Sequence, residues 1–137
     1  MSDCPFCNFE YSISKLIHHY RYWNLFLHAD EKRDETRQAA GFLASKDHVA
    51  TPADLSTEAW QELQLIVKDA GSRLCEAVGV TYLDQEAVGF NQGDMIGQTV
   101  DHAHVHIFPV AKEDPEELKR RSGMSAAFEA LRRERLG

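Results

Sequence analysis

Three histidines, His102, His104 and His106, occupy alternate positions in the segment GQTVDHAHVHIFP, which spans residues 97–109. Every second side chain of a β-strand points to the same face, so a strand here places the three imidazoles in one row, about 6.6 Å apart along the backbone. Polar positions of a strand that only faces solvent are usually Thr, Lys, Glu or Ser. Three successive histidines instead favour metal ligation or phosphate chemistry, because imidazole can act as ligand, nucleophile or acid near neutral pH.

The residues before the histidine row favour phosphate chemistry. Gly97 lets the backbone approach a ligand closely, Gln98 and Thr99 carry neutral hydrogen-bond donors, and Asn91 lies shortly upstream. Neutral donors around a group of imidazoles suit an anionic oxygen that gains charge during a reaction. A second arrangement, three histidines as an open catalytic metal site, predicts a metal held by His104 and His106.

A pair of cysteines, Cys4 and Cys7, has the two-residue spacing of many zinc sites. The spacing alone is also compatible with a redox pair or a labile disulfide. A redox motif should follow a strand and open a helix, and no strand precedes position 4. Cys75 lies beside the apolar stripe of a predicted helix, where we expect a small buried hydrophobe.

The elements that position these residues can be predicted from local patterns. Apolar residues recur at i, i+3 and i+4 from residue 63 to 78, which predicts an amphipathic helix of about six turns, begun by Asp54 or Ser56 and ended by Gly79. Residues 20–28, 38–45, 80–90 and 98–110 are typical of strands, with a charged turn over 30–37. After Pro115 the pattern is helical. The expected fold class is α+β.

Size and composition narrow the possible functions. A chain of 137 residues with 43% hydrophobic and 27% charged residues is expected to form one globular domain. Fifteen basic and 22 acidic residues give a net charge of −7, which argues against a nucleic acid polymer as partner. No apolar run is long enough to span a membrane, and the polar start does not resemble a secretory signal. With only three cysteines, the expected location is cytoplasmic.

The segment His102-Ala103-His104-Val105-His106-Ile107-Phe108 resembles the His-x-His-x-His-x-x signature of the histidine triad (HIT) superfamily of nucleotide hydrolases and transferases. Gly97-Gln98-Thr99-Val100 and Asn91 extend the similarity. The resemblance implies a single HIT-like domain over residues 1–137, with an antiparallel sheet, one long helix and a helical tail over about 112–137. It also implies a homodimer in which the sheet continues from one copy to the other.

The resemblance further implies cleavage of a nucleoside phosphate at the α-phosphorus. In that mechanism His104 is the nucleophile and forms a nucleotidyl-histidine, which water hydrolyses. His106, Gln98 and Thr99, with the backbone of Gly97, contact phosphate oxygens or the leaving group. Asn91 lies near the phosphate or ribose. The expected substrates are dinucleoside polyphosphates or nucleoside phosphoramidates, with no organic cofactor; the alternative is a non-catalytic, zinc-stabilised nucleotide-binding or interaction protein.

A metal site is also implied by this resemblance. Some HIT proteins, and the related galactose-1-phosphate uridylyltransferases, combine a Cys-x-x-Cys pair with a mid-chain histidine and the first histidine of the triad. Lys46-Asp47-His48 resembles the Lys-x-His of that subgroup. The implied ligands of a Zn²⁺ ion are Cys4, Cys7, His48 and His102. Four protein ligands leave no open position, so such a zinc is structural and ties about residues 1–10 to the base of the histidine strand.

One region departs from the family pattern. HIT hydrolases usually carry an Asp or Asn after the first hairpin strand, then a proline-containing turn and a Gly-His pair. Residues 24–48 contain no proline, and Ala40 or Phe42 stands where the family histidine is expected. His28 or Asn24 could replace it, and the sequence does not decide between them. His18 and His19 are expected at the surface.

Overall fold

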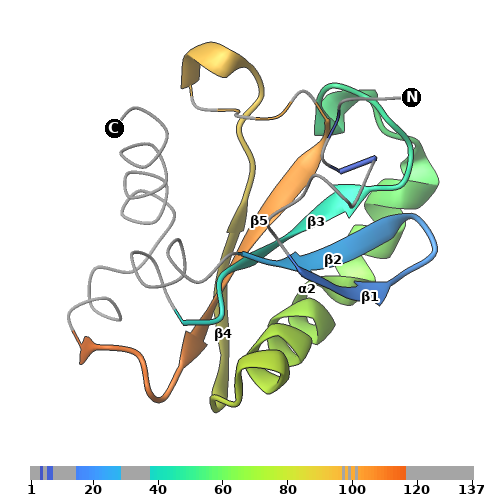
Figure 1. The fold of residues 1–137 in the computed structure, drawn as a ribbon. Helices are drawn as coiled ribbons and strands as arrows, with labels where there is room; N and C mark the ends of the chain where they lie inside the picture. Colours follow the sequence, from blue (N-terminus) through green and yellow to red (C-terminus); the bar gives the residue numbers. More distant parts are fainter. Residues whose placement is uncertain are drawn as a thin grey trace.

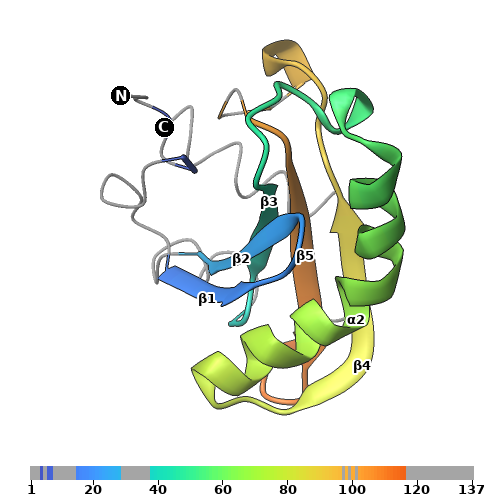
Figure 2. The same cartoon turned by 90° about the vertical axis from the view of Figure 1, so that its right-hand side faces the viewer.

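A computed structural model describes residues 4, 6, 7, 15–28, 38–96, 98, 100 and 102–116. These residues build a five-stranded sheet with strand order β1-β2-β3-β5-β4, in which every neighbouring pair is antiparallel. One long helix, α2, packs along one face of the sheet (Figures 1 and 2). The α+β class and the antiparallel sheet with one long helix are therefore as predicted.

The strands are short and the helix is long. The strands are β1 Lys15–His19, β2 Trp23–Leu27, β3 Gly41–Ser45, β4 Tyr82–Gly89 and β5 His104–Ala111, and the helix is α2 Thr57–Val78. Among the described residues, two short 3₁₀ helices, η2 Pro52–Asp54 and η3 Asp94–Ile96, lie in the loops.

One strand was not predicted, and several strand boundaries differ from the sequence-based expectation; β3, for example, begins at Gly41 and not at Gln38. The edge strand β1 was not predicted, because its five residues have no clear alternation and become a strand by pairing with β2. The strand predicted over 20–28 begins at Trp23, since the amide of Tyr20 donates to the Trp23 carbonyl across the preceding turn at 2.8 Å. β5 begins at His104, not near Gln98, so His102 lies just before the strand.

The helix α2 begins and ends where its sequence indicates. The Ser56 side chain accepts a hydrogen bond from the Ala59 amide at 3.2 Å, which caps the first turn. Gly79 ends the helix in the left-handed conformation, with φ of 85°, and its amide donates to the Cys75 and Glu76 carbonyls. The predicted helix and its end at Gly79 are confirmed, and of the two candidate N-caps, Asp54 and Ser56, the structure shows Ser56.

The two faces of the sheet have different compositions. On the helix side, Trp23, Leu25, Leu43, Val105 and Ile107 form the main core with the apolar stripe of α2. The alternate residues of the same strands point to the opposite face. There Phe26, Phe42 and Ala44 form a second apolar cluster, against which Phe6 and Leu16 pack.

The strand register aligns the imidazoles with this second cluster. In the β3–β5 pair, Phe42 lies opposite His106 and Ala44 lies opposite His104. Because opposite residues of paired strands share a face, both histidines project from the face away from α2. The helix packs on one face of the sheet, and the histidines lie on the opposite face.

Two expectations on the chain ends lie largely outside the described residues. Of the predicted N-terminal metal-binding segment, residues 4, 6 and 7 are described, and of the predicted helical tail only residues 112–116, which include a turn after β5. The division of the chain into a single domain over 1–137 stays a prediction. No helix in the described ranges has both the length and the apolar character needed to cross a bilayer.

Candidate active site and metal site

His104, the first residue of β5, is a buried imidazole with a fixed orientation. Its side chain is 6% exposed, and its Nδ1 donates a hydrogen bond to the His102 carbonyl at 2.7 Å. A carbonyl can only accept, so Nδ1 carries the proton and Nε2 carries the lone pair. Burial lowers the pKa of His104, and the bond to His102 offsets this in part. The ring is therefore neutral at pH 7 and can act as a nucleophile.

Aromatic rings stand edge-on around His104. The ring centroids of Phe6, His106 and Phe42 lie 5.1, 5.1 and 6.1 Å from that of His104, with interplanar angles of 78°, 76° and 73°. Such surroundings exclude water, which explains the burial of the imidazole and strengthens any electrostatic interaction formed there. The face away from α2 thus combines an apolar wall with a neutral imidazole.

A fourth imidazole lies next to the histidine row. His28 follows β2 and is 8% exposed, and its ring centroid is 5.9 Å from that of His106, with the two planes only 23° apart. His28 also contacts Phe42, at 5.0 Å between ring centroids. Asn24, the other candidate left open by the sequence, accepts a hydrogen bond from Nδ1 of His19 at 2.6 Å. Of these two candidates, the structure places His28 beside the triad.

Gln98 is buried, and its side-chain amide forms hydrogen bonds with backbone groups of two separate segments. Its Nε2 donates to the carbonyls of Ala50 and Val100 at 2.7 and 2.9 Å, and its Oε1 accepts from the Gly93 amide at 2.8 Å. The side chain therefore fastens the loop between β4 and β5 to the segment that follows β3. The predicted phosphate contact by Gln98 would require it to exchange one of these bonds.

The other loop residues are only partly described. Asn91 is half-buried and comes two residues after Gly89, which pairs with His106, so it lies at the end of the sheet where β5 begins. Gly97 and Thr99 lie outside the described residues, and their predicted contacts with phosphate stay predictions.

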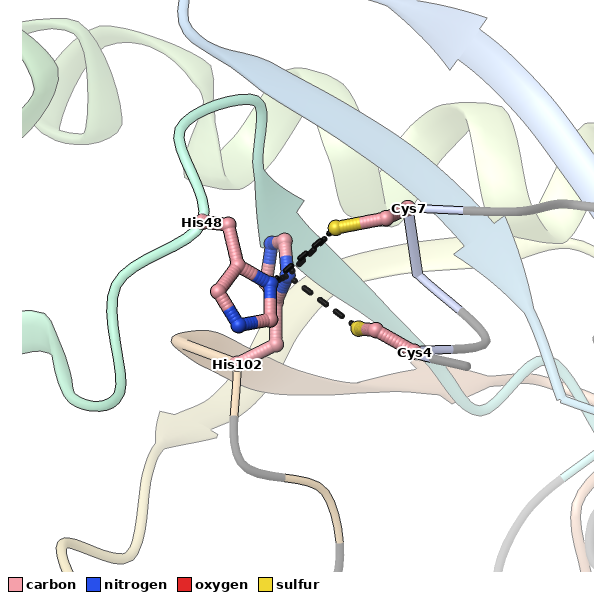
Figure 3. Close-up of side chains that lie close together, drawn as sticks. All are labelled: Cys4, Cys7, His48 and His102. Carbon is pink, nitrogen blue, oxygen red and sulfur yellow. Dashed lines mark hydrogen bonds between the residues drawn. The ribbon is translucent and has the colours of Figure 1, made fainter. Parts of the chain in front are cut away.

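A second group of side chains gathers at the base of β5. Cys4, Cys7, His48 and His102 come from three separate parts of the chain, and their four ligand atoms all lie within 4.8 Å of one another (Figure 3). His102 Nδ1 is 3.4 and 3.5 Å from the two sulfur atoms and 2.9 Å from His48 Nδ1, and the Cys7 sulfur is 3.0 Å from His48 Nδ1. This arrangement could hold a metal ion.

The orientation of His102 suits such a ligand. Its Nε2 donates to the Ser45 carbonyl at 2.6 Å, so the lone pair of the neutral ring is on Nδ1, which points at the thiols and at His48. Burial lowers the pKa of His102, the bond to Ser45 opposes this, and His48 lowers it further. The neutral form, which a metal requires, is therefore favoured.

Sequence reasoning assigned no role to Phe6, and it left His28 and Asn24 open as alternatives. Phe6 lies between the two cysteines, and its ring packs on Phe42 at 4.7 Å and on Phe26 at 6.1 Å between centroids. The Cys-x-x-Cys spacing indicates a tight turn but not the surface on which the intervening ring packs. The position of His28 depends on the register of three strands, which local sequence does not reveal.

Comparisons with known proteins agree with this fold and with the histidine pattern. The model of the HIT domain family matches residues 41–113, which is more than half of the chain. The chain therefore belongs to the HIT family.

Solved structures are similar over most of the chain. A HIT family hydrolase from Clostridium thermocellum is 20% identical with a TM-score of 0.59, over 85% of this chain and 97% of that one. A hypothetical histidine triad nucleotide-binding protein from Sulfolobus tokodaii is 21% identical with a TM-score of 0.61, over 95% and 85%. A HIT family member from Bacillus subtilis is 17% identical with a TM-score of 0.62, over 82% and 76%. A comparison with curated proteins gave no match.

Proposed function

We propose that this HIT-family protein hydrolyses a nucleoside phosphate at the α-phosphorus through a covalent nucleotidyl intermediate on His104. The observation that carries the proposal is the 2.7 Å hydrogen bond from His104 Nδ1 to the His102 carbonyl, which leaves Nε2 as the nucleophilic atom. The names of similar structures, a hydrolase and a nucleotide-binding protein, support the same class of activity. The proposed substrates are dinucleoside polyphosphates or nucleoside phosphoramidates.

In the first step Nε2 forms a bond to the α-phosphorus, and the bond from phosphorus to the leaving group breaks. A polyphosphate leaves as an anion, whereas the amine of a phosphoramidate takes up a proton from solvent as it leaves. The ring then has a proton on Nδ1 and phosphorus on Nε2, so it carries a positive charge, and the His102 carbonyl stabilises that charge. In the second step water attacks phosphorus, the phosphorus–nitrogen bond breaks and a nucleoside monophosphate leaves. The neutral ring is restored, and the proton of the water passes to bulk solvent.

His106, Asn91, Gly97, Gln98 and Thr99 are proposed to contact the phosphate oxygens, the leaving group or the ribose. His106 supports this role best, because its ring centroid lies 5.1 Å from that of His104 on the same face. A group at this distance can reach an oxygen bound to a phosphorus that His104 attacks.

We further propose that Cys4, Cys7, His48 and His102 bind one structural Zn²⁺. Two thiolates and two imidazoles form a typical tetrahedral zinc donor set, in which neighbouring ligand atoms lie about 3.3–3.8 Å apart. The sulfur–nitrogen distances of 3.4 and 3.5 Å to His102 agree with this range, whereas the two contacts of His48, 2.9 Å to His102 and 3.0 Å to Cys7, are shorter. The ion would hold the N-terminal turn, and with it Phe6, against the sheet. Four protein ligands leave it no open position for substrate.

The homodimer and the cytoplasmic location remain predictions. In the described sheet the two edge strands are β1 and β4, so a dimer that continues the sheet must pair one of them with its symmetry mate. Light scattering of the purified protein tests this directly: a mass of one chain would exclude the dimer.

Turnover of diadenosine polyphosphates and of adenosine phosphoramidate tests the proposed activity. Denaturing the enzyme during turnover of labelled substrate should trap label on protein, in a bond that is labile to acid and stable to base. The alternative, a zinc-stabilised nucleotide-binding or interaction protein without catalysis, is motivated by the departure from the family pattern at Ala40 and Phe42. Nucleotide binding without turnover of any such substrate would favour that alternative.

A further inference from the structure

His28 is brought to the site from a strand that is not adjacent to β5. The amide of His28 donates to the Ala40 carbonyl at 3.1 Å, which aligns the end of β2 with the start of β3. Ala40 lies two residues before Phe42, so strand alternation places its methyl group on the same face. Because this methyl group is small, the His28 ring reaches across β3 to within 5.9 Å of the His106 ring, centroid to centroid.

The surroundings of this pair of rings are mostly apolar. Phe42 contacts His28 at 5.0 Å, and the Phe108 ring is nearly parallel to that of His106, at 5.8 Å and 12°. On the neighbouring strand β4, Gly89 and Ala87 lie opposite His106 and Phe108. A hydrogen bond from an imidazole to an anionic oxygen is strong in such surroundings, since little solvent screens it.

The geometry points to a two-imidazole phosphate subsite, made by His28 and His106, that binds anionic oxygens of the nucleotide beside His104. This inference rests on the proposed function for the identity of the ligand. The cluster of Cys4, Cys7, His48 and His102 closes the other end of the histidine row. A phosphate at His104 can therefore extend past His106 towards His28, but not past His102. His28, the residue after β2, would thus supply an imidazole that the family pattern usually places in the returning strand of the hairpin.

Binding of AMP and of adenosine separates phosphate recognition from nucleoside recognition, because the two ligands differ by one phosphate. His28→Phe keeps an aromatic ring against His106 and Phe42 but removes both nitrogens. We expect it to weaken AMP binding about ten- to a hundredfold, the factor for loss of a hydrogen bond to a charged group, and to leave adenosine binding unchanged. His28→Gln, which keeps a donor, should restore part of the AMP affinity.

The matched control is His19→Phe, which changes an exposed histidine on the neighbouring strand β1 and should leave both affinities unchanged. Calorimetric titration gives the affinities, and thermal unfolding shows whether each variant is folded. Equal losses of AMP and adenosine affinity in His28→Phe, or no loss in either, would overturn the subsite. So would a His28→Gln variant that binds AMP no better than His28→Phe.

These outcomes are distinct from failure of the proposed function. If the wild-type protein turns over no nucleotide but its AMP affinity depends on His28 as described, the proposed hydrolase activity is wrong and the phosphate subsite is supported. If turnover is found and His28→Phe leaves AMP affinity intact, the hydrolase stands and the subsite is wrong. Wild-type protein that neither binds AMP nor turns over any nucleotide would overturn both.

Discussion

The carbonyl of His102 accepts a hydrogen bond from Nδ1 of His104 at 2.7 Å, while the ring of His102 belongs to the Cys4–Cys7–His48 cluster. One residue thus takes part in both groups of side chains. A shift of the His102 ring on metal binding or loss can reach, through Cβ, Cα and the carbonyl carbon of the same residue, the oxygen that orients the proposed nucleophile. A metal that never touches substrate can therefore still influence the rate.

Removal of the His104 ring should abolish turnover without preventing nucleotide binding. We expect His104→Ala to lower kcat by about 10⁴-fold or more, the scale found when a covalent nucleophile is lost. Steady-state rates with diadenosine tetraphosphate, together with AMP titrations, measure the two effects separately. His18→Ala, on the edge strand β1, is the control and should retain its activity. A His104→Ala variant with full activity would exclude the covalent mechanism.

Replacement of either N-terminal cysteine should remove the metal. Cys4→Ser and Cys7→Ser are expected to lose the one equivalent of zinc predicted for the wild type, and to unfold at a lower temperature because metal bound only to the native state stabilises it. Elemental analysis and calorimetry measure these effects. Cys75→Ala is the matched control and should retain zinc, since Cys75 is a buried core residue of α2 itself.

The same measurement separates a structural from a catalytic metal. Zinc that survives His104→Ala but not Cys4→Ser would fit the four-ligand site. Zinc lost in His104→Ala and retained in Cys4→Ser would instead identify the histidine row as the ligands, and the structural site would be wrong. If elemental analysis finds no zinc in the wild-type protein, the proposed metal site is wrong. The proposed hydrolase activity does not depend on this result and is tested separately.

The three thiols should differ in reactivity. Burial, and to a lesser degree the carboxylate of Asp114, raises the pKa of Cys75 to about 12. A raised thiol pKa means that Cys75 stays protonated at pH 8 and reacts slowly with a disulfide reagent. We expect two reactive thiols, Cys4 and Cys7, after zinc is removed with a chelator, and the third only in denaturant. Two thiols that react at the same rate before and after chelation would argue against a metal at this pair.

A side chain at position 41 should destabilise the fold. A Cβ on Gly41 would meet the carbonyl oxygen of Phe26 and, at 2.6 Å, the side chain of Leu74. Backbone on one side and a buried core side chain on the other leave little room to adjust, so Gly41→Ala should cost about 1–3 kcal/mol. Urea denaturation measures the loss.

Gly79→Ala is the comparison for this variant. No atom lies within 4 Å of a Cβ at that position, but φ is +85°, so its cost comes from backbone conformation alone and is about 1 kcal/mol. An unchanged free energy of unfolding for Gly41→Ala would show that β2 and α2 can move apart more easily than their packing indicates.

The sequence predicts those parts of this protein that depend on local patterns. The 3.6-residue period from Leu63 to Val78, with Ser56 before it and Gly79 after it, specifies α2 because a helix is stabilised by neighbours along the chain. The alternation of His104, Val105 and His106 likewise specifies a strand with two unlike faces.

Contacts between distant segments were less predictable. The cluster of Cys4, Cys7, His48 and His102 was expected only through resemblance to a family, since nothing local links position 4 to position 102. The stack of His28 on His106 depends on the registers of β2, β3 and β5 and on the small side chain at Ala40. The buried bonds of Gln98 depend on how two loops meet, which no periodic pattern encodes.

The separation of the two sheet faces has a consequence for how this protein can change. Val105 and Ile107 belong to the hydrophobic core, whereas His104 and His106 lie on the opposite face. Substitutions of the first pair should therefore change stability, and substitutions of the second pair should change the candidate active site. Deletion of one residue between His104 and Ile107 would reverse the facing of the residues that follow it, so that part of the imidazole row would enter the core and aliphatic side chains would face the ligand. Point replacements on one face of β5 can therefore change ligand binding while the core is kept, whereas an insertion or deletion within β5 would disturb both at once.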